Sequence, residues 1–92
     1  MTFAKELTER FLRYVAIPSE SNGRAGVVPS SEGQRELARL LEAELREMGL
    51  EEIELNEHAI LTAKLPGNKA GVPAIGWVAH LDTVPVALSP EV

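Results

Sequence analysis

A histidine and an aspartate separated by one residue, His80 and Asp82, are the side chains of this sequence best placed to act on another molecule. They follow an apolar run, Ala74–Ala79, and Thr83 comes directly after them. Residues two apart on an extended strand point to the same side, so we expect the imidazole and the carboxylate to lie together. An imidazole binds a metal through one ring nitrogen, and a carboxylate on its other N–H fixes the ring. The spacing therefore suits a metal ligand, His80, with Asp82 as its orienting partner.

Each of these residues also has an interpretation without any chemistry. A histidine at a strand end is often a polar tip that bonds a backbone carbonyl, and an aspartate before Thr83 can begin an Asx turn. Ligands of open α/β sheets collect at the carboxyl ends of strands, which favours a functional site at this position. The weaker candidates are Glu51 and Glu52 at an expected strand edge, His58 in a polar turn, and Ser89, which has no general base nearby.

Length and composition limit the classes of protein to consider. Ninety-two residues form one domain at most, or part of one, and the hydrophobic share of 45% is ordinary for a globular protein. The net charge of −5 argues against a nucleic-acid partner, whose binding surface would be basic. The absence of cysteine excludes disulfides, thiolate metal sites and a cysteine nucleophile. We expect no membrane partner, since no stretch approaches the ~18 apolar residues of a membrane span, and a cytoplasmic location.

Two helices come first among the elements that must position the pair. Apolar residues at spacings of three and four predict a helix from Phe3 to about Val15, with its charged residues largely on the solvent side. Thr2 is expected to cap the start of this helix, and the helix is expected to end before Pro18. A loop over Ser19–Ser30 follows.

The second helix shows the most regular pattern. It is predicted to begin at a capping box of Ser31 and Gln34 and to end before Gly49, which suits the left-handed C′ position. The predicted core-facing stripe is Leu37, Leu40, Leu41, Leu45 and Met48.

Three strands are expected after the helices. Alternating residues predict a hairpin of Glu51–Leu55 with Ala59–Leu65, turned at Asn56. Ala74–Ala79 is apolar on both faces, which predicts a central strand covered on two sides. The expected fold class is therefore α/β, with two helices packed on a small three-stranded mixed sheet in the order α-α-β-β-β. The tail Val86–Val92 has no clear period.

Residues Gly76–Pro85 resemble the first metal-binding motif of the co-catalytic zinc exopeptidases, a superfamily that includes aminoacylases, desuccinylases, carnosinases and peptidase T. The motif is an apolar strand followed by His-x-Asp, then Thr or Val, and then Val-Pro. The segments that are similar to peptidase T, the tripeptide aminopeptidases, are Arg10–Val15, Val28–Gln34, Glu47–Leu50 and Ala63–Asn68. The resemblance implies that residues 1–92 are the N-terminal part of a catalytic domain, ending after its first metal motif, without a second domain. The chain departs from the family at Val86-Ala87-Leu88, where a polar residue usually follows.

The resemblance also implies roles for the two residues. His80 would bind one of two zinc ions in the intact enzyme, and Asp82 would hold its imidazole, while the family's remaining ligands and general base would lie beyond Val92. We expect the intact enzyme to remove the N-terminal residue of short peptides, and this chain alone to be inactive and to bind zinc weakly. The alternative is a freestanding non-catalytic α/β domain that acts in protein association. An uncovered Ala74–Ala79 strand also predicts homo-oligomers through the exposed sheet.

Overall fold

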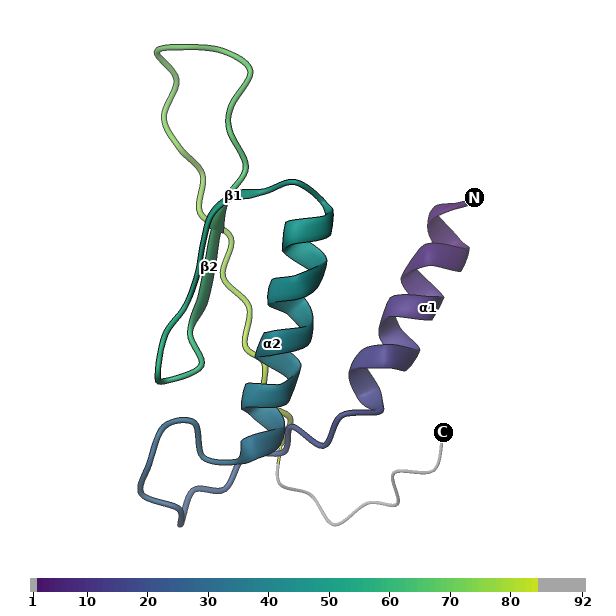
Figure 1. Ribbon diagram of the computed structural model, residues 1–92, viewed down its shortest axis with the longest axis vertical. Helices are drawn as coiled ribbons and strands as arrows, with labels where there is room; N and C mark the ends of the chain where they lie inside the picture. Colours follow the sequence, from purple (N-terminus) through teal and green to yellow (C-terminus); the bar gives the residue numbers. More distant parts are fainter. Residues whose placement is uncertain (1, 85–92) are drawn as a thin grey trace.

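The described part of the chain, residues 2–84 of a computed structural model, consists of two helices and a β-hairpin (Figure 1). Helix α1 spans Phe3–Val15, helix α2 spans Glu32–Glu47, strand β1 spans Glu51–Leu55 and strand β2 spans Leu61–Lys64. The strands pair antiparallel, and α2 packs against both of them. The expected α/β class is confirmed. Pro85 and the tail Val86–Val92, with Ser89, lie outside the described residues.

Helix α1 begins and ends as its sequence predicts. The hydroxyl of Thr2 accepts a hydrogen bond from the backbone N–H of Lys5 at 3.3 Å, which satisfies one of the free donors of the first turn. The helix ends at Val15, before Pro18, whose ring disfavours helical geometry in the residue ahead of it.

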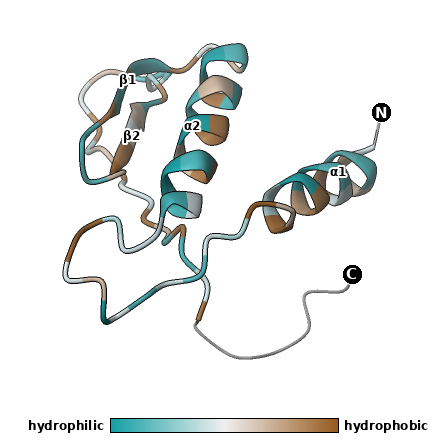
Figure 2. Ribbon diagram, turned by 60° about the horizontal axis from the view of Figure 1, so that its bottom comes forward, coloured by the Kyte–Doolittle hydropathy of each residue, from teal (hydrophilic) through white to brown (hydrophobic). Residues whose placement is uncertain are grey.

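The side of α1 that faces the molecule differs from the expectation. Its arginines Arg10 and Arg13 contact α2, whereas its apolar side chains are exposed. Figure 2 shows α1 set apart from the rest of the chain, with hydrophobic residues along one side. The exposed apolar side chains of α1 are Phe3, Leu7, Phe11, Leu12 and Val15. The contact between the two helices is made by charged groups, since α2 offers the carboxylate of Glu44 to the arginines.

Helix α2 supplies most of the core. Leu37 and Ala38 are buried, and the rest of the predicted stripe is half-buried except for Met48, which is exposed. Gly49 follows with φ of 83°, in the C′ conformation that its position predicts.

The start of α2 is predicted correctly, but its capping box is wrong. Ser31 is the N-cap residue, yet its side chain makes no capping hydrogen bond. The amide nitrogen of Gln34 instead donates to the hydroxyl of Ser30 at 3.0 Å and to the carbonyl of Glu20 at 3.4 Å. The Gln34 side chain therefore binds the long loop before the helix instead of forming a capping box.

The hairpin forms where alternation predicts it. The side-chain oxygen of Asn56 accepts hydrogen bonds from the backbone N–H groups of His58 at 2.9 Å and Ile60 at 3.0 Å, which shapes the turn. Ile53 and Leu55 of β1 are half-buried, while the acidic residues of the strand are exposed.

The expected third strand, Ala74–Ala79, is not formed. No ladder joins this segment to another within residues 2–84, and the side chains of Trp77 and Val78 are 92% and 99% exposed. The sheet is therefore a two-stranded antiparallel hairpin rather than a three-stranded mixed sheet. A strand that is apolar on both faces requires neighbours that cover it, and the described segments do not provide them.

The described residues do not enclose a complete core. Their buried apolar residues are Leu37, Ala38 and Ala59. The Cα radius of gyration is 15.4 Å, whereas a compact domain of this length has about 12 Å. Neither helix of the described part is long and apolar enough to cross a bilayer.

Candidate metal site

The segment that carries His80 and Asp82 is held in place by Thr83. The backbone N–H of Thr83 donates to the carbonyl of Ser19 at 3.2 Å, and its carbonyl accepts from the N–H of Ser21 at 2.9 Å. These two bonds form a parallel bridge with Glu20, in the loop after α1. Residues 72–84 thereby return from the hairpin to the base of α2, along the yellow path in Figure 1.

The imidazole of His80 contacts Asp82 as the spacing predicts. Nδ1 of His80 lies 3.0 Å from Oδ1 of Asp82 and 2.7 Å from the backbone carbonyl oxygen of the same residue. Both neighbours are acceptors, so Nδ1 carries the proton and Nε2 of the neutral ring keeps its lone pair. The His80 side chain is 81% exposed, and Nε2 has no hydrogen-bond partner among residues 2–84. The ring is therefore oriented through one nitrogen and accessible through the other, as in a metal-ligating histidine.

The described residues offer one candidate metal ligand, His80, rather than a complete set of ligands. No group of three histidine, cysteine, aspartate or glutamate side chains within residues 2–84 could hold a metal ion. A catalytic zinc takes about three protein ligands and a water molecule. The donors present thus fit the role of a single imidazole ligand with its orienting carboxylate.

The other sequence candidates lie apart from this contact. Nδ1 of His58 is 3.3 Å from the carbonyl of Val28, and its Nε2 is 3.5 Å from the Glu57 carboxylate. The exposed Glu52 pairs with Lys64 at 3.6 Å, as expected for a solvated strand edge. Among the described residues, no hydrogen bond or ion pair joins His58 or Glu52 to His80 or Asp82.

A hollow of about 610 Å³ opens beside the His80–Asp82 contact. We call it the hairpin hollow; its lining comprises residues 77–82, residues 58–62, Val28 and Gln34. Both histidines of the chain border it, and most of its other lining side chains are apolar.

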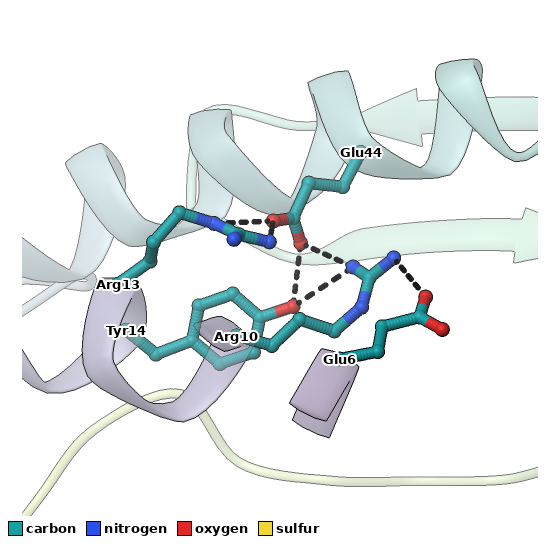
Figure 3. Close-up of polar contacts among 5 residues, drawn as sticks. All are labelled: Glu6, Arg10, Arg13, Tyr14 and Glu44. Carbon is teal, nitrogen blue, oxygen red and sulfur yellow. Dashed lines mark hydrogen bonds and ion pairs between the residues drawn. The ribbon is translucent and has the colours of Figure 1, made fainter. Parts of the chain in front are cut away.

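A second charged cluster, absent from the expectations, joins α1 to α2 (Figure 3). The Glu44 carboxylate accepts hydrogen bonds from Arg13 at 2.7 and 3.2 Å, from Arg10 at 3.0 Å and from the hydroxyl of Tyr14. The Glu44 side chain is only 10% exposed. Because both carboxylate oxygens are occupied by α1, the cluster docks one helix on the other and has no free group for chemistry.

The surroundings of this cluster change the pKa of its members. Burial favours the neutral form of Glu44, but hydrogen bonds from Tyr14 and Arg13 and the charge of Arg10 outweigh burial and lower the pKa. Burial and the hydrogen bond to Glu44 raise the pKa of Tyr14. Hydrogen bonds with Tyr14 and Glu6 raise the pKa of Arg10, which stays charged.

The position of Glu44 in the sequence indicates that its side chain is buried, although apolar periodicity does not consider charged residues. The residue lies seven positions after Leu37 and three after Leu41, so a carboxylate occupies a position on the core-facing stripe of α2. A buried carboxylate requires partners, and arginines on the neighbouring helix can supply them.

Comparison with known proteins finds close relatives along the whole chain. No model of a protein family matches it. The chain is 46% identical over 92 residues to the Peptidase T-like protein of Yersinia pestis and 52% identical over 92 residues to that of Rhizobium meliloti. It is 51% identical over 81 residues to Peptidase T of Aeromonas salmonicida. The chain covers 22%, 22% and 20% of these proteins, so it spans about a fifth of their length.

Proposed function

We propose, because this chain is a homologue of peptidase T along its whole length, that it is an N-terminal segment of a zinc-dependent aminopeptidase acting on short peptides. The observation that carries the proposal is the contact of His80 with Asp82, which leaves Nε2 of an exposed ring without a partner among residues 2–84 and able to bind a metal. A zinc-exopeptidase catalytic domain and a cytoplasmic location are parts of the same proposal.

In this proposal each of the two residues has one task. His80 holds a metal through Nε2, and Asp82 keeps the proton on Nδ1 and increases the basicity of the ring. Zinc bound there would act as a Lewis acid on the peptide carbonyl and would lower the pKa of a bound water molecule. The other ligands of a two-zinc site belong to the four fifths of the relatives that this chain does not match. The chain alone is therefore inactive.

The test uses a hybrid protein in which this chain replaces the segment that it matches in the Rhizobium meliloti relative. The hybrid should hydrolyse a tripeptide and release its N-terminal residue. His80→Ala should abolish hydrolysis and lower the zinc content measured by mass spectrometry. Asp82→Asn should reduce metal affinity or activity by about 10–100-fold, as losing the partner of a ligating histidine does.

The matched control is Glu57→Gln, which neutralises an exposed carboxylate of the hairpin turn that contacts neither residue of the pair. It should leave both zinc content and hydrolysis unchanged. An active hybrid whose zinc content and turnover survive His80→Ala would refute the proposal.

A further inference from the structure

The segment that carries His80 and Asp82 is tied to the rest of the described chain at one residue. Within residues 2–84, the hydrogen bonds that join residues 72–84 to other segments are the two of Thr83, to the carbonyl of Ser19 and the N–H of Ser21. The hydrogen bonds of the His80 ring stay within the segment. The direction in which the imidazole leaves the backbone therefore depends on where residues 19–21 lie.

Residues 19–21 are held on their opposite side by Gln34. Successive carbonyl groups of an extended backbone point to opposite sides, so the carbonyl of Ser19 bonds Thr83 and that of Glu20 is left for a partner on the other side. The side-chain nitrogen of Gln34 donates to this second carbonyl at 3.4 Å. The amide thus takes the place of a neighbouring strand, with Glu20 between Gln34 and Thr83.

Gln34 also closes the loop before α2 at its other end. Its side-chain nitrogen donates to the hydroxyl oxygen of Ser30 at 3.0 Å, and the same oxygen accepts the backbone N–H of Asn22 at 3.0 Å. An amide nitrogen carries two N–H groups, so both donors of Gln34 are used. Gln34 borders the hairpin hollow together with His80 and Asp82. The side chain therefore joins the first turn of α2 to the loop beside the two candidate site residues.

We propose that Gln34 is a positioning residue for His80 and Asp82, an inference that rests on the proposed function. Its amide fixes the carbonyl of Glu20 against α2, and the bridge to Thr83 passes that position on to the residues just before it. Gln34 itself binds no metal in this arrangement, but it sets the direction from which the His80 ring meets an ion. A displacement of about 1 Å at a reacting centre can lower a rate about 100-fold, so a small shift of the ring is costly.

Gln34→Glu in the hybrid protein tests the inference, because it keeps the shape of the side chain and removes its donors. A carboxylate has no N–H and repels the carbonyl of Glu20, whereas the hydroxyl of Ser30 can still donate to it. We expect the affinity for zinc to fall about 10-fold or more. The visible spectrum of the cobalt-substituted hybrid should change at saturating cobalt, because it reports the geometry of the ligands. The backbone N–H of Thr83 should exchange with solvent about 10-fold faster.

Arg35→Gln is the matched control. Arg35 follows Gln34 in α2 and also donates to a backbone carbonyl, at 2.7 Å, but that carbonyl belongs to Glu57 of the hairpin turn. The control should lower the thermal midpoint of the hybrid, as Gln34→Glu does, and keep the affinity for zinc within about twofold. Equal losses of zinc affinity in the two variants would make Gln34 a general stabiliser of the fold and overturn the inference.

His80→Ala separates this inference from the proposed function. If His80→Ala removes zinc but Gln34→Glu leaves the zinc affinity and the cobalt spectrum unchanged, the inference fails and the proposed function stands. If zinc survives His80→Ala, the proposed function fails, and the exchange of the Thr83 N–H decides alone. Unchanged exchange in Gln34→Glu then overturns the inference, and faster exchange supports the hold of Gln34 on the segment.

Discussion

Gly33, in the first turn of α2, lies directly against the carbonyl group of Pro18. A β-carbon at Gly33 would sit 1.5 Å from that oxygen. The next residue along the loop, Ser19, is buried, and its carbonyl accepts the N–H of Thr83. The close approach permitted by a glycine thus fixes the loop that holds the segment of His80 and Asp82.

Gly33→Ala should therefore destabilise the fold and disturb the segment of His80. We expect a loss of about 1–3 kcal/mol in the free energy of unfolding, because the new methyl group overlaps a backbone oxygen. Urea unfolding measures the loss, and the amide resonances of Ser21 and Thr83 report the displaced bridge. The control is Gly23→Ala, where nothing lies within 4 Å and φ is not in the left-handed range, and which should cost less than about 0.5 kcal/mol.

Glu44→Gln should loosen the docking of α1 on α2. The substitution removes the charge that accepts hydrogen bonds from Arg10, Arg13 and Tyr14, and we expect a loss of about 1–3 kcal/mol at pH 7. The pKa of Glu44 is lower in the folded state than in the unfolded state, where it is about 4.5. The contribution of Glu44 to stability is therefore present above pH 4.5 and disappears as the pH falls through the pKa of the folded state. Urea unfolding at pH 7 and pH 3 should show that acidification removes this contribution of Glu44 from the native chain. The variant should not show this part of the decline. Glu42→Gln, which breaks an exposed pair with Arg46, should cost only about 0.3–0.5 kcal/mol, and an equal cost at both positions would refute the docking role.

The raised pKa of Tyr14 predicts a second loss of stability, at alkaline pH. Its pKa is higher in the folded state, so the folded chain binds the phenolic proton more tightly. The contribution of Tyr14 to stability is present below the pKa of about 10 that the residue has in the unfolded state. It is lost as the pH rises above that value towards the pKa in the folded state. Tyr14→Phe should remove this part of the alkaline decline in urea midpoints between pH 9 and pH 11. A variant that declines as steeply as the native chain would show that Tyr14 does not cause it.

The 92-residue chain alone should bind zinc only weakly. One imidazole cannot replace the three protein ligands of a catalytic site, so we expect a Kd on the order of 0.1 mM or weaker in isothermal titration. Zinc-dependent shifts of the His80 ring resonances should disappear in His80→Ala. Tight one-to-one binding by the native chain would be incompatible with this prediction.

The chain alone should also associate with itself. Without the rest of the polypeptide, the free edges and the exposed Trp77 and Val78 favour pairing with a second copy. Light scattering should give a mass above the 10.0 kDa of one chain, and Val78→Lys should return it towards the monomer while Val72→Lys does not. A monomer at high concentration would count against this prediction.

Much of the local structure follows from patterns a few residues long. Thr2, Pro18 and Gly49 place helix ends correctly because caps and breakers act within one turn. Alternation in Glu51–Leu55 predicts the hairpin, since its partner follows after one turn. The contact of His80 with Asp82 also depends only on a spacing of two in extended backbone.

Contacts between distant segments could not be obtained in this way. The docking of α1 through Glu44, the close approach of Gly33 to Pro18 and the bridge between Glu20 and Thr83 each join residues whose meeting depends on the path of the whole chain. The apolar run Ala74–Ala79 has the pattern of a central strand but remains unpaired in the described residues. A strand exists only when neighbours complete its hydrogen bonds, so its residue pattern expresses a preference that the surrounding fold must satisfy.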